Sequence, residues 1–306
     1  MKALTVGAFD ALHIAHQHII KLISKFEESA LVTFDIPPKS YLTADPYLFS
    51  LNERLFLLKN FLKTLEIEGL TPPKIVVLEF PRVKNFSAEQ FLAKLRKIFY
   101  FEVLVAGEDF SVGRKVRRGN FERIKTWCMA KNVSLIKMKA IKRNKNRVST
   151  SLIKTLLMKA KLEEATKLLG RPYSVSYTVV RGKGLGKKIG FPTANAKISP
   201  DRFLPPEGVY LSKTIIEGRR NLYDSLTFIG KSFPYRENPS FETHILNFSE
   251  DIYEQRITVL LIKRLRDNIR FSSKDELKTV LENDVKMATN LHKTSFIPEQ
   301  QLSFFL

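Results

Sequence analysis

Two histidines lie three residues apart just after the first apolar segment of the chain. The segment Ala3–Val6 is typical of a short strand, and a loop beginning at Gly7 leads to His13 and His16. Side chains three apart share one face of a helix, and the amides at a helix start favour a bound anion. Such a pair can donate hydrogen bonds to triphosphate oxygens and stabilise charge that develops on phosphorus.

The spacing of the two histidines leaves other interpretations open. They could be ligands of a metal site, although no third histidine follows in register and no Glu-x-x-His accompanies them. They could also be incidental. The loop that precedes them contains Gly7, Phe9 and Asp10, and this context between strand and helix favours the phosphate interpretation.

Glycines alternate with cations in a second segment, Arg181–Asn195. Such a backbone can approach phosphates closely, although a plain hairpin loop would have the same composition. Thr193 and Asn195 would supply the hard oxygen ligands that Mg²⁺ prefers when it also holds phosphates. The glycines, which fit neither the dinucleotide-binding pattern nor the P-loop pattern, are Gly182, Gly184, Gly186 and Gly190.

Two more positions carry groups that could take part in phosphoryl transfer. Glu242 begins a β-rich run, where its carboxylate could accept the proton of an attacking hydroxyl or could simply face solvent. Ser149, Thr150 and Ser151 are suited to capping a helix. Capping and phosphate binding are compatible, since both use the free amides of a helix start.

The elements that must position these groups follow from the hydrophobic periodicity. In the first half, β-rich runs alternate with helical patterns, which predicts an α/β domain with a parallel sheet whose ligands bind at the carboxyl ends of the strands. The expected strands are Ala3–Val6, Ala30–Phe34, Ile75–Leu78, Val103–Ala106 and Leu135–Met138, and the expected helices are Ile14–Phe26, Leu51–Leu65, Ala88–Ile98 and Asn120–Lys131.

The second half has a different texture. One helix is expected over Ser149–Leu169, ended by Gly170 and Pro172. Closely spaced β runs then predict a small antiparallel barrel, followed by an amphipathic helix over Lys274–Leu291. The expected barrel strands are Ser174–Val180, Gly208–Thr214, Leu226–Ile229, Glu242–Phe248 and Arg256–Ile262.

Composition limits the classes of function. The chain has 306 residues, which suggests two domains, and a formal net charge of +20. That charge indicates anionic partners such as nucleic acid, an acidic membrane or phosphorylated small molecules. The alternative is that the basic side chains simply form a solvated face. A single cysteine, Cys128, fits a reducing compartment, and no apolar run approaches the roughly 18 to 20 residues that span a bilayer. We therefore expect a soluble, cytoplasmic protein.

These motifs together resemble the HxGH nucleotidyltransferases, and in particular the bacterial bifunctional riboflavin kinase/FMN adenylyltransferase family. The resemblance extends to about residue 292, and the glycine-rich stretch is its most specific part. The further matching stretches are Ala106–Gly113, Val148–Lys154, Gly182–Asn195, Phe241–Leu246 and Arg264–Asp267.

The resemblance implies a division of labour between two domains. Residues 1–169 would adenylylate FMN to FAD, residues 170–292 would phosphorylate riboflavin to FMN with Mg-ATP, and 293–306 would form a tail. In the first domain, His13 and His16 would be catalytic; the ATP site would contain Gly7, Phe9, Asp10, His13, His16, Ser149, Thr150, Ser151 and Lys154, and the flavin site Asp109 and Phe110. In the second, Glu242 would be the general base; the ATP site would contain Gly182, Gly186, Lys187, Gly190, Pro192, Thr193 and Asn195, the flavin site Arg266 and Phe271, and Mg²⁺ would be held by Thr193 and Asn195.

Several positions depart from the family pattern. Ala11 and Ala15 stand where the family has glycine, and Lys154 replaces an arginine. Phe228 stands for asparagine and Asn268 for glutamate, Glu254 replaces a glycine, and the arginine of the usual Arg-Pro-Thr is missing from the stretch 231–234. A paralogue that retains one activity is therefore an alternative.

The last residues lie beyond the resemblance. The stretch Gln300–Leu306 resembles the short peptides by which bacterial replication proteins dock on the sliding clamp. A hydrophobic tail that folds back on the barrel is the competing interpretation.

His244, Trp127 and most phenylalanines are expected to be packing residues. The rival class of function is a basic protein that binds nucleic acid or the clamp and is built on an inactive enzyme fold. For the enzyme itself, neither nucleic acid nor a membrane is expected as a partner.

Overall fold

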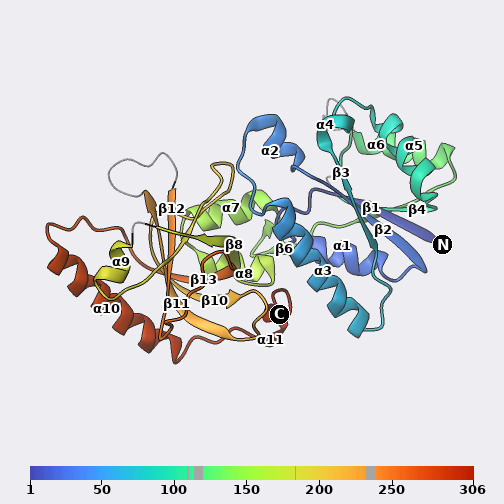
Figure 1. Ribbon diagram of the computed structural model, residues 1–306. Coiled ribbons are helices and arrows are strands. Elements are labelled where there is room, and N and C mark those ends of the chain that lie inside the picture. The colour runs from blue at the N-terminus through green and yellow to red at the C-terminus, as the bar shows by residue number, and fades with distance from the viewer. Residues whose placement is uncertain (109, 114–119, 183, 232–238) are drawn as a thin grey trace. The chain divides into compact units, whose positions relative to one another are not determined.

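The computed structural model describes all residues except 109, 114–119, 183 and 232–238, and it divides into two compact units, Met1–Thr150 and Ser151–Leu306. The first unit contains a five-stranded sheet with the order β3-β2-β1-β4-β5, in which every neighbouring pair is parallel (Figure 1). The order confirms the expected α/β class. Its strands are β1 Lys2–Val6, β2 Glu28–Phe34, β3 Lys74–Leu78, β4 Val103–Gly107 and β5 Ser134–Met138.

Helices cover this sheet, and their starts are fixed locally. Capping boxes at Ser50 with Glu53 and at Ser87 with Gln90 begin the helices α3 and α5. A short antiparallel hairpin, β6 Lys142–Arg143 and β7 Asn146–Arg147, follows the sheet. The helices are α1 Ile14–Ile23, α2 Pro38–Thr43, α3 Leu51–Ile67, α4 Phe80–Val83, α5 Ala88–Phe99 and α6 Asn120–Ala130.

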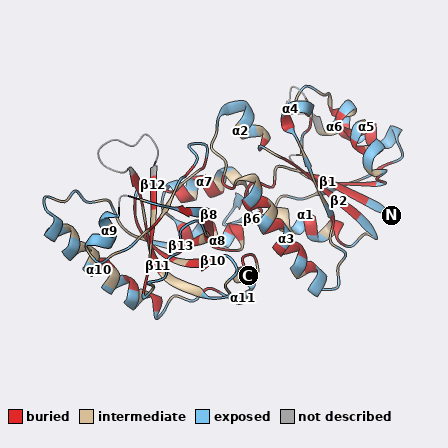
Figure 2. Cartoon of the chain, in the orientation of Figure 1, coloured by how far each residue is buried: buried red, intermediate tan, exposed pale blue. Residues whose placement is uncertain are grey.

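The core of the first unit lies between the sheet and the helices α5 and α6. Leu4, Val6 and Leu104 from the strands pack in one cluster with Leu92 and Trp127 from the helices. The strands β1 and β2 are buried along nearly their whole length, as in Figure 2, which is typical of a parallel sheet covered on both faces. The interpretation of Trp127 as a packing residue is consistent with this cluster.

The second unit contains a closed barrel, which confirms the expected architecture. Its strand order is β10-β11-β12-β9-β8-β13, with antiparallel pairing throughout. The short strand β9, which sequence patterning did not indicate, completes the barrel. The strands are β8 Tyr173–Val180, β9 Ala194–Ala196, β10 Gly208–Ile216, β11 Leu222–Lys231, β12 Pro239–Ile245 and β13 Arg256–Arg266.

Two helices replace the single helix expected over Ser149–Leu169. Helix α7, Thr150–Met158, ends where Ala160 takes a left-handed conformation with φ 53°. The amide of Lys161 donates to Leu156 O and that of Ala160 to Leu157 O, which is the pattern of a helix-ending Schellman motif. Helix α8, Leu162–Leu169, then begins anew and packs on β8 and β13. Apart from Thr150, both helices lie in the second compact unit, and the domain boundary after residue 169 stays a prediction.

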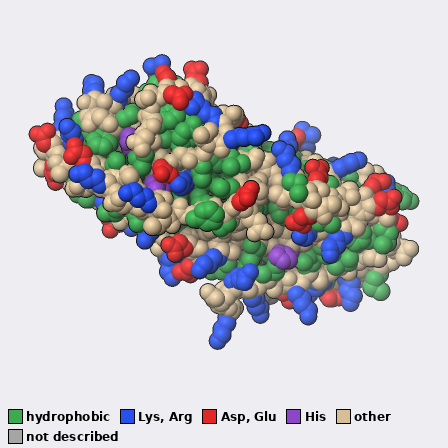
Figure 3. All heavy atoms as spheres, turned by 90° about the horizontal axis from the view of Figure 1, so that it is seen from below, with side chains coloured by type: hydrophobic (Ala, Val, Ile, Leu, Met, Phe, Trp, Pro, Cys, Tyr) green, Lys and Arg blue, Asp and Glu red, His purple; other side chains and the backbone are tan. Residues whose placement is uncertain are grey.

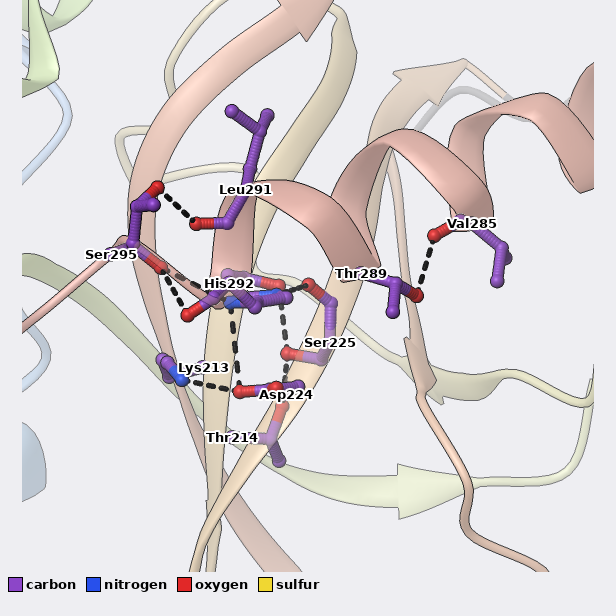
Figure 4. Close-up of polar contacts among 11 residues, drawn as sticks. Lys213, Thr214, Asp224, Ser225, Val285, Thr289, Leu291, His292 and Ser295 are labelled. Atoms are coloured by element: carbon purple, nitrogen blue, oxygen red, sulfur yellow. Dashed lines mark hydrogen bonds and ion pairs between the residues drawn. The ribbon is translucent and has the colours of Figure 1, made fainter.

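The terminal helix α10, Lys274–His292, docks on the barrel through its last two turns. Ala288 packs with Val209, Leu211 and Leu226 in a core cluster. At the end of the helix His292 is buried and its Nε2 donates to the carbonyl of Ser225, 3.2 Å away, as Figure 4 shows. Apolar packing and the polar contacts of His292 with Ser225 and Asp224 therefore hold the helix end against the barrel.

The tail folds back, as one of the two interpretations expected. Phe304 and Phe305 are each only 5% exposed, and the Arg171 guanidinium lies 5.0 Å from the centroid of the Phe304 ring. Two short helices, α9 Leu185–Lys188 and α11 Glu299–Leu302, complete the second unit.

Candidate active sites

The loop after β1 is held at nearly every residue. The amide of Gly7 donates to Val32 O, the carboxylate of Asp10 accepts from the amides of Leu48 and Phe49, and Gln17 Nε2 donates to Leu12 O. Phe9 and Leu12 adopt left-handed conformations, with φ 47° and 41°. This tightly turned loop delivers the first histidine to the start of α1.

His13 is the N-cap of α1, and its Nδ1 accepts a hydrogen bond from the amide of His16, 3.3 Å away. The two imidazole rings are stacked, with centroids 3.7 Å apart, and Phe9 meets the ring of His16 edge-on at 5.0 Å. Because Nδ1 of His13 is an acceptor, a neutral His13 carries its hydrogen on Nε2. That nitrogen can donate to a phosphate oxygen.

The sheet order places two predicted loops side by side. β1 pairs with β4 in parallel, so the loop 7–13 and the loop after Gly107 both leave the sheet at the carboxyl ends of the strands. The strand order reverses at this pair, which is where open α/β sheets bind ligands. Phe110, expected at the flavin side, is half-buried against the core, and Asp109 lies outside the described residues.

The alanines that replace family glycines fit without strain. Ala15 lies within α1, and neither Ala11 nor Ala15 is among the described residues with positive φ. A β-carbon built on Gly7, by contrast, would lie 3.1 Å from the Phe9 ring. A side chain at Gly7 would therefore crowd the Phe9 ring, whereas the backbone at the two alanine positions does not call for glycine.

Sequence reasoning missed Arg54, on the first turn of α3. Its side chain is 1% exposed, and its guanidinium donates to the carbonyls of Ala8 and Asp35 and to Thr33 Oγ1. Burial lowers the pKa of Arg54, and the fields of Asp10 and Asp35 oppose that shift. The available signal was the helical spacing of Arg54 with Leu57, Leu58 and Phe61, which places this cation on an apolar face of α3.

The residues expected from the second nucleotide motif lie at the start of α7. Ser149 and Thr150 belong to the first unit, and Ser151 and Lys154 to the second. Lys154 is buried, with its ammonium 5.9 Å from the centroid of the Phe203 ring. Their role in the ATP site of the first domain stays a prediction.

In the barrel, Glu242 and Asn195 are direct partners in the β12–β9 ladder. Glu242 Oε2 accepts a hydrogen bond from Thr193 Oγ1 at 3.3 Å, and Asn195 Nδ2 donates to the carbonyl of Thr193 at 3.0 Å. Thr193, Asn195 and Glu242, which sequence analysis assigned to one kinase site, thus lie in direct contact with one another.

The glycine-rich stretch packs closely against Asn195 and Phe191. A β-carbon on Gly182 would lie 2.7 Å from Asn195 Nδ2, and one on Gly186 would collide with the carbonyl oxygen of Phe191. Gly190 has φ 92°, a conformation that glycine adopts readily. Lys187 is exposed on the turn of α9. The stretch therefore needs glycine for close approach, as its composition indicates.

His244 does more than pack. Its Nδ1 donates to the carbonyl of Pro192 across 2.7 Å, and its ring meets Phe191 edge-on at 5.7 Å. Burial lowers the pKa of His244, while the bond to Pro192 opposes the shift. The histidine holds the segment directly before Thr193, and its place two residues after Glu242 on the same strand face was the signal in the sequence.

Two departures from the family pattern meet at one glycine. Phe228 lies directly opposite Glu242 in the β11–β12 ladder. A β-carbon on Gly230 would lie 2.6 Å from Asn268 Nδ2 and 2.7 Å from Phe228 Cζ. The Phe228 ring and the Asn268 amide therefore both lie over Gly230, on the strand next to the one that carries the predicted general base.

Of the two expected flavin contacts of the barrel, Arg266 is the last residue of β13 and Phe271 lies between β13 and α10. The guanidinium of Arg266 forms a two-bond pair with the buried carboxylate of Asp284, at 2.8 and 2.6 Å. Its Nη1 also donates to Asp267 O. Phe271 is half-buried. Flavin binding by Arg266 and Phe271 stays a prediction, and the structure shows Arg266 fixing α10 to the barrel.

A parallel α/β unit and a closed antiparallel barrel unit, each with a candidate phosphate loop, are the arrangement of a two-domain transferase of the nucleotidyl and phosphoryl type. Family models match both halves: an FAD synthetase model covers residues 1–152 and a riboflavin kinase model covers residues 169–292. The chain belongs to the bifunctional riboflavin kinase/FMN adenylyltransferase family.

Relatives of full length agree with this assignment. The chain is 29% identical to the bifunctional riboflavin kinase/FMN adenylyltransferase of Buchnera aphidicola, covering 93% of this chain and 92% of that protein. It is 28% identical to the enzyme of the same description from Bacillus subtilis, over 95% and 93%. A crystal structure described as a macrolide-efflux protein from Streptococcus pneumoniae has a TM-score of 0.77 at 26% identity, covering 94% of each chain.

The surface gives no sign of one dominant basic stripe on the face seen in Figure 3, where Lys and Arg side chains lie among acidic and apolar ones. Among the residues that the structure describes, no helix has the length and apolar character needed to cross a membrane. In the same part of the chain, no group of three His, Cys, Asp or Glu side chains is arranged to hold a metal.

Proposed function

We propose that the chain makes FAD from riboflavin in two ATP-dependent steps, one in each domain. The observation that carries the proposal is that both family models match one chain, each over the half whose fold presents a phosphate loop. A nucleic-acid or clamp-binding protein on an inactive fold is not favoured, because both family models and the bifunctional relatives match along nearly the whole chain.

In the barrel, the carboxylate of Glu242 accepts the proton of the riboflavin 5′-hydroxyl. The hydroxyl oxygen attacks the γ-phosphorus of ATP, the bond to the bridging oxygen breaks, and FMN and ADP are formed. The hydrogen bond from Thr193 and the ladder pairing with Asn195 hold Glu242 in place. Positioning of the carboxylate supplies much of the rate.

In the α/β domain, a phosphate oxygen of FMN attacks the α-phosphorus of a second ATP, and pyrophosphate leaves. The attacking phosphate is already anionic, so the protein need not remove a proton. His13 and His16 donate hydrogen bonds to the triphosphate at the start of α1, where the helix amides add to the positive field. The catalytic contribution is stabilisation of charge on phosphorus.

Thr193 and Asn195 would hold Mg²⁺ in the barrel. Their hydroxyl and amide oxygens are hard donors of the kind that Mg²⁺ takes beside phosphates, and they lie together next to the Glu242 carboxylate. When bound, the ion would neutralise charge on the phosphates of ATP. Removal of Mg²⁺ with a chelator should abolish FMN formation, and added Mg²⁺ should restore it.

The test of both activities is direct. The protein is incubated with riboflavin, ATP and Mg²⁺, and the flavins are separated by chromatography. FMN followed by FAD supports both steps, FMN alone would confine activity to the barrel, and neither product would refute the proposal. FMN supplied in place of riboflavin tests the second step separately.

A cytoplasmic location and clamp docking by Gln300–Phe305 both stay predictions. Against docking, the two aromatic side chains that would serve as anchors, Phe304 and Phe305, are both buried, and the Phe304 ring lies against the Arg171 guanidinium. Docking would therefore require the tail to leave the position it takes in the structure.

A further inference from the structure

The loop that carries His13 depends on a cation from another helix. Arg54 lies in the first turn of α3, far from the histidines in sequence, and reaches the carbonyl of Ala8 with Nη1 at 3.0 Å. Thr33 Oγ1 donates to the same carbonyl, also at 3.0 Å, and accepts from Arg54 at 3.2 Å. Three groups thus close a small network at the exits of β1 and β2.

The tie between α3 and the loop runs in both directions. Asp10 reaches from the loop to the amides of Leu48 and Phe49, which directly precede the N-cap of α3. Arg54 reaches from α3 back to Ala8 and, at 2.6 Å, to Asp35 O. A shift of the helix start would therefore move the loop on both sides of Phe9.

The three acceptors of Arg54 are neutral: two carbonyl oxygens and one hydroxyl. A guanidinium stays charged in proteins, so a fixed positive charge lies in a buried setting at the root of this loop. Burying such a group is costly, which a helix face of leucines would avoid. The loop it supports is the one proposed to receive the ATP phosphates.

We propose that Arg54 is a positioning residue for adenylyl transfer, which fixes the Ala8 carbonyl and thereby the stacked histidine pair. The inference rests on the proposed function of the α/β domain. Thr33 is the second member of the same device. A residue that acts this way affects the rate with bound substrates more than it affects substrate binding, because small displacements of catalytic groups cost rate steeply.

The experiment measures FAD formation from FMN at varied ATP in Arg54→Met, Arg54→Lys and Thr33→Val. We expect Arg54→Met to lower kcat by about 10- to 100-fold with a smaller change in KM for ATP. Arg54→Lys keeps the charge but not the planar fork, so it should recover only part of kcat. Thr33→Val has the same shape without the hydroxyl and should lower kcat about 3- to 10-fold.

Thr64→Val is the matched control, since Thr64 lies on the same helix and its hydroxyl donates within the helix, to Phe61 O. Riboflavin phosphorylation by the barrel of each variant should stay within twofold of the wild type. A wild type without FAD formation would refute the proposed function itself. With an active wild type, unchanged kcat in Thr33→Val and in folded Arg54→Met overturns the inference. If Arg54→Met fails to fold, Thr33→Val alone decides. Loss of folded protein at constant kcat per folded molecule would make Arg54 a structural residue only.

Discussion

Thr193 donates from Oγ1 to Oε2 of Glu242 across 3.3 Å, which joins the glycine-rich segment to the strand that carries the predicted base. The link depends on β9, whose pairing with β12 sets Asn195 opposite Glu242. The proposed kinase site, which combines two distant stretches of sequence, therefore depends on the Thr193 hydroxyl and on the pairing of β9 with β12.

Glu242→Gln should abolish FMN formation and leave FAD formation from supplied FMN intact. The amide cannot accept the hydroxyl proton as a carboxylate does, so we expect a loss of about 10²- to 10⁴-fold in the kinase rate. Glu217→Gln, at an exposed position in the same unit, is the control. Equal loss of both reactions in Glu242→Gln would contradict two separate sites.

Gly182→Ala should impair FMN formation more than FAD formation. The added methyl would lie 2.7 Å from Asn195 Nδ2 and must displace the amide or the loop. In Gly7→Ala the added methyl would lie 3.1 Å from the Phe9 ring, so this variant should impair FAD formation more than FMN formation. Chromatography of both products in both variants checks the pair, and the same pattern in the two variants would argue against separate phosphate loops.

His13→Ala and His13→Asn separate capping from chemistry. Both should lower FAD formation by about 10²- to 10³-fold, as expected when a donor to developing charge is removed. Asparagine still caps α1, so His13→Ala should unfold more easily by about 1 kcal/mol. His16→Ala, which leaves the cap side chain in place, should lose FAD formation and keep FMN formation. Full activity in His13→Asn would refute a role for the imidazole.

The stability of the barrel should fall as the pH drops below about 6.5, the ordinary pKa of histidine. Burial lowers the pKa of His292, helped by Lys213 and opposed by the Ser225 carbonyl and Asp224 (Figure 4). Between the lowered native value and about 6.5 the unfolded chain binds more protons, so the free energy of unfolding rises with pH there.

Urea unfolding at several pH values checks this dependence. His292→Gln should flatten the slope, whereas His18→Gln, at an exposed position on α1, should leave it unchanged. An unaltered slope in His292→Gln would mean that another group, such as His244 with its similarly lowered pKa, carries the effect.

Phe304→Ala should destabilise the second unit by roughly 3 to 5 kcal/mol, the usual cost of removing a buried phenyl ring. Phe296→Ala provides the matched control, because Phe296 is 82% exposed whereas Phe304 is 5% exposed. Thermal or urea unfolding of the two variants gives the comparison. Similar stabilities would show that the tail is detached in solution and available to a partner.

Much of this protein was readable from local sequence. The five sheet strands and the longer helices α1, α3, α5 and α6 of the first domain, and the barrel class, follow from periodicity, turn chemistry and residue type, which act over a few residues. The short helices α2 and α4 and the hairpin β6–β7 were not predicted. One local signal was misread: the left-handed turn at Ala160 splits the helix expected over Ser149–Leu169 without a glycine to mark it.

Tertiary structure alone decided which distant residues meet. The strand order 3-2-1-4-5 sets the loop after β1 beside the loop after β4, and barrel closure through the three-residue β9 sets Asn195 opposite Glu242. Arg54 looked like any helical arginine until packing buried it against Ala8. Register and burial depend on contacts between segments far apart in the chain, and residue type and spacing carry no direct record of them.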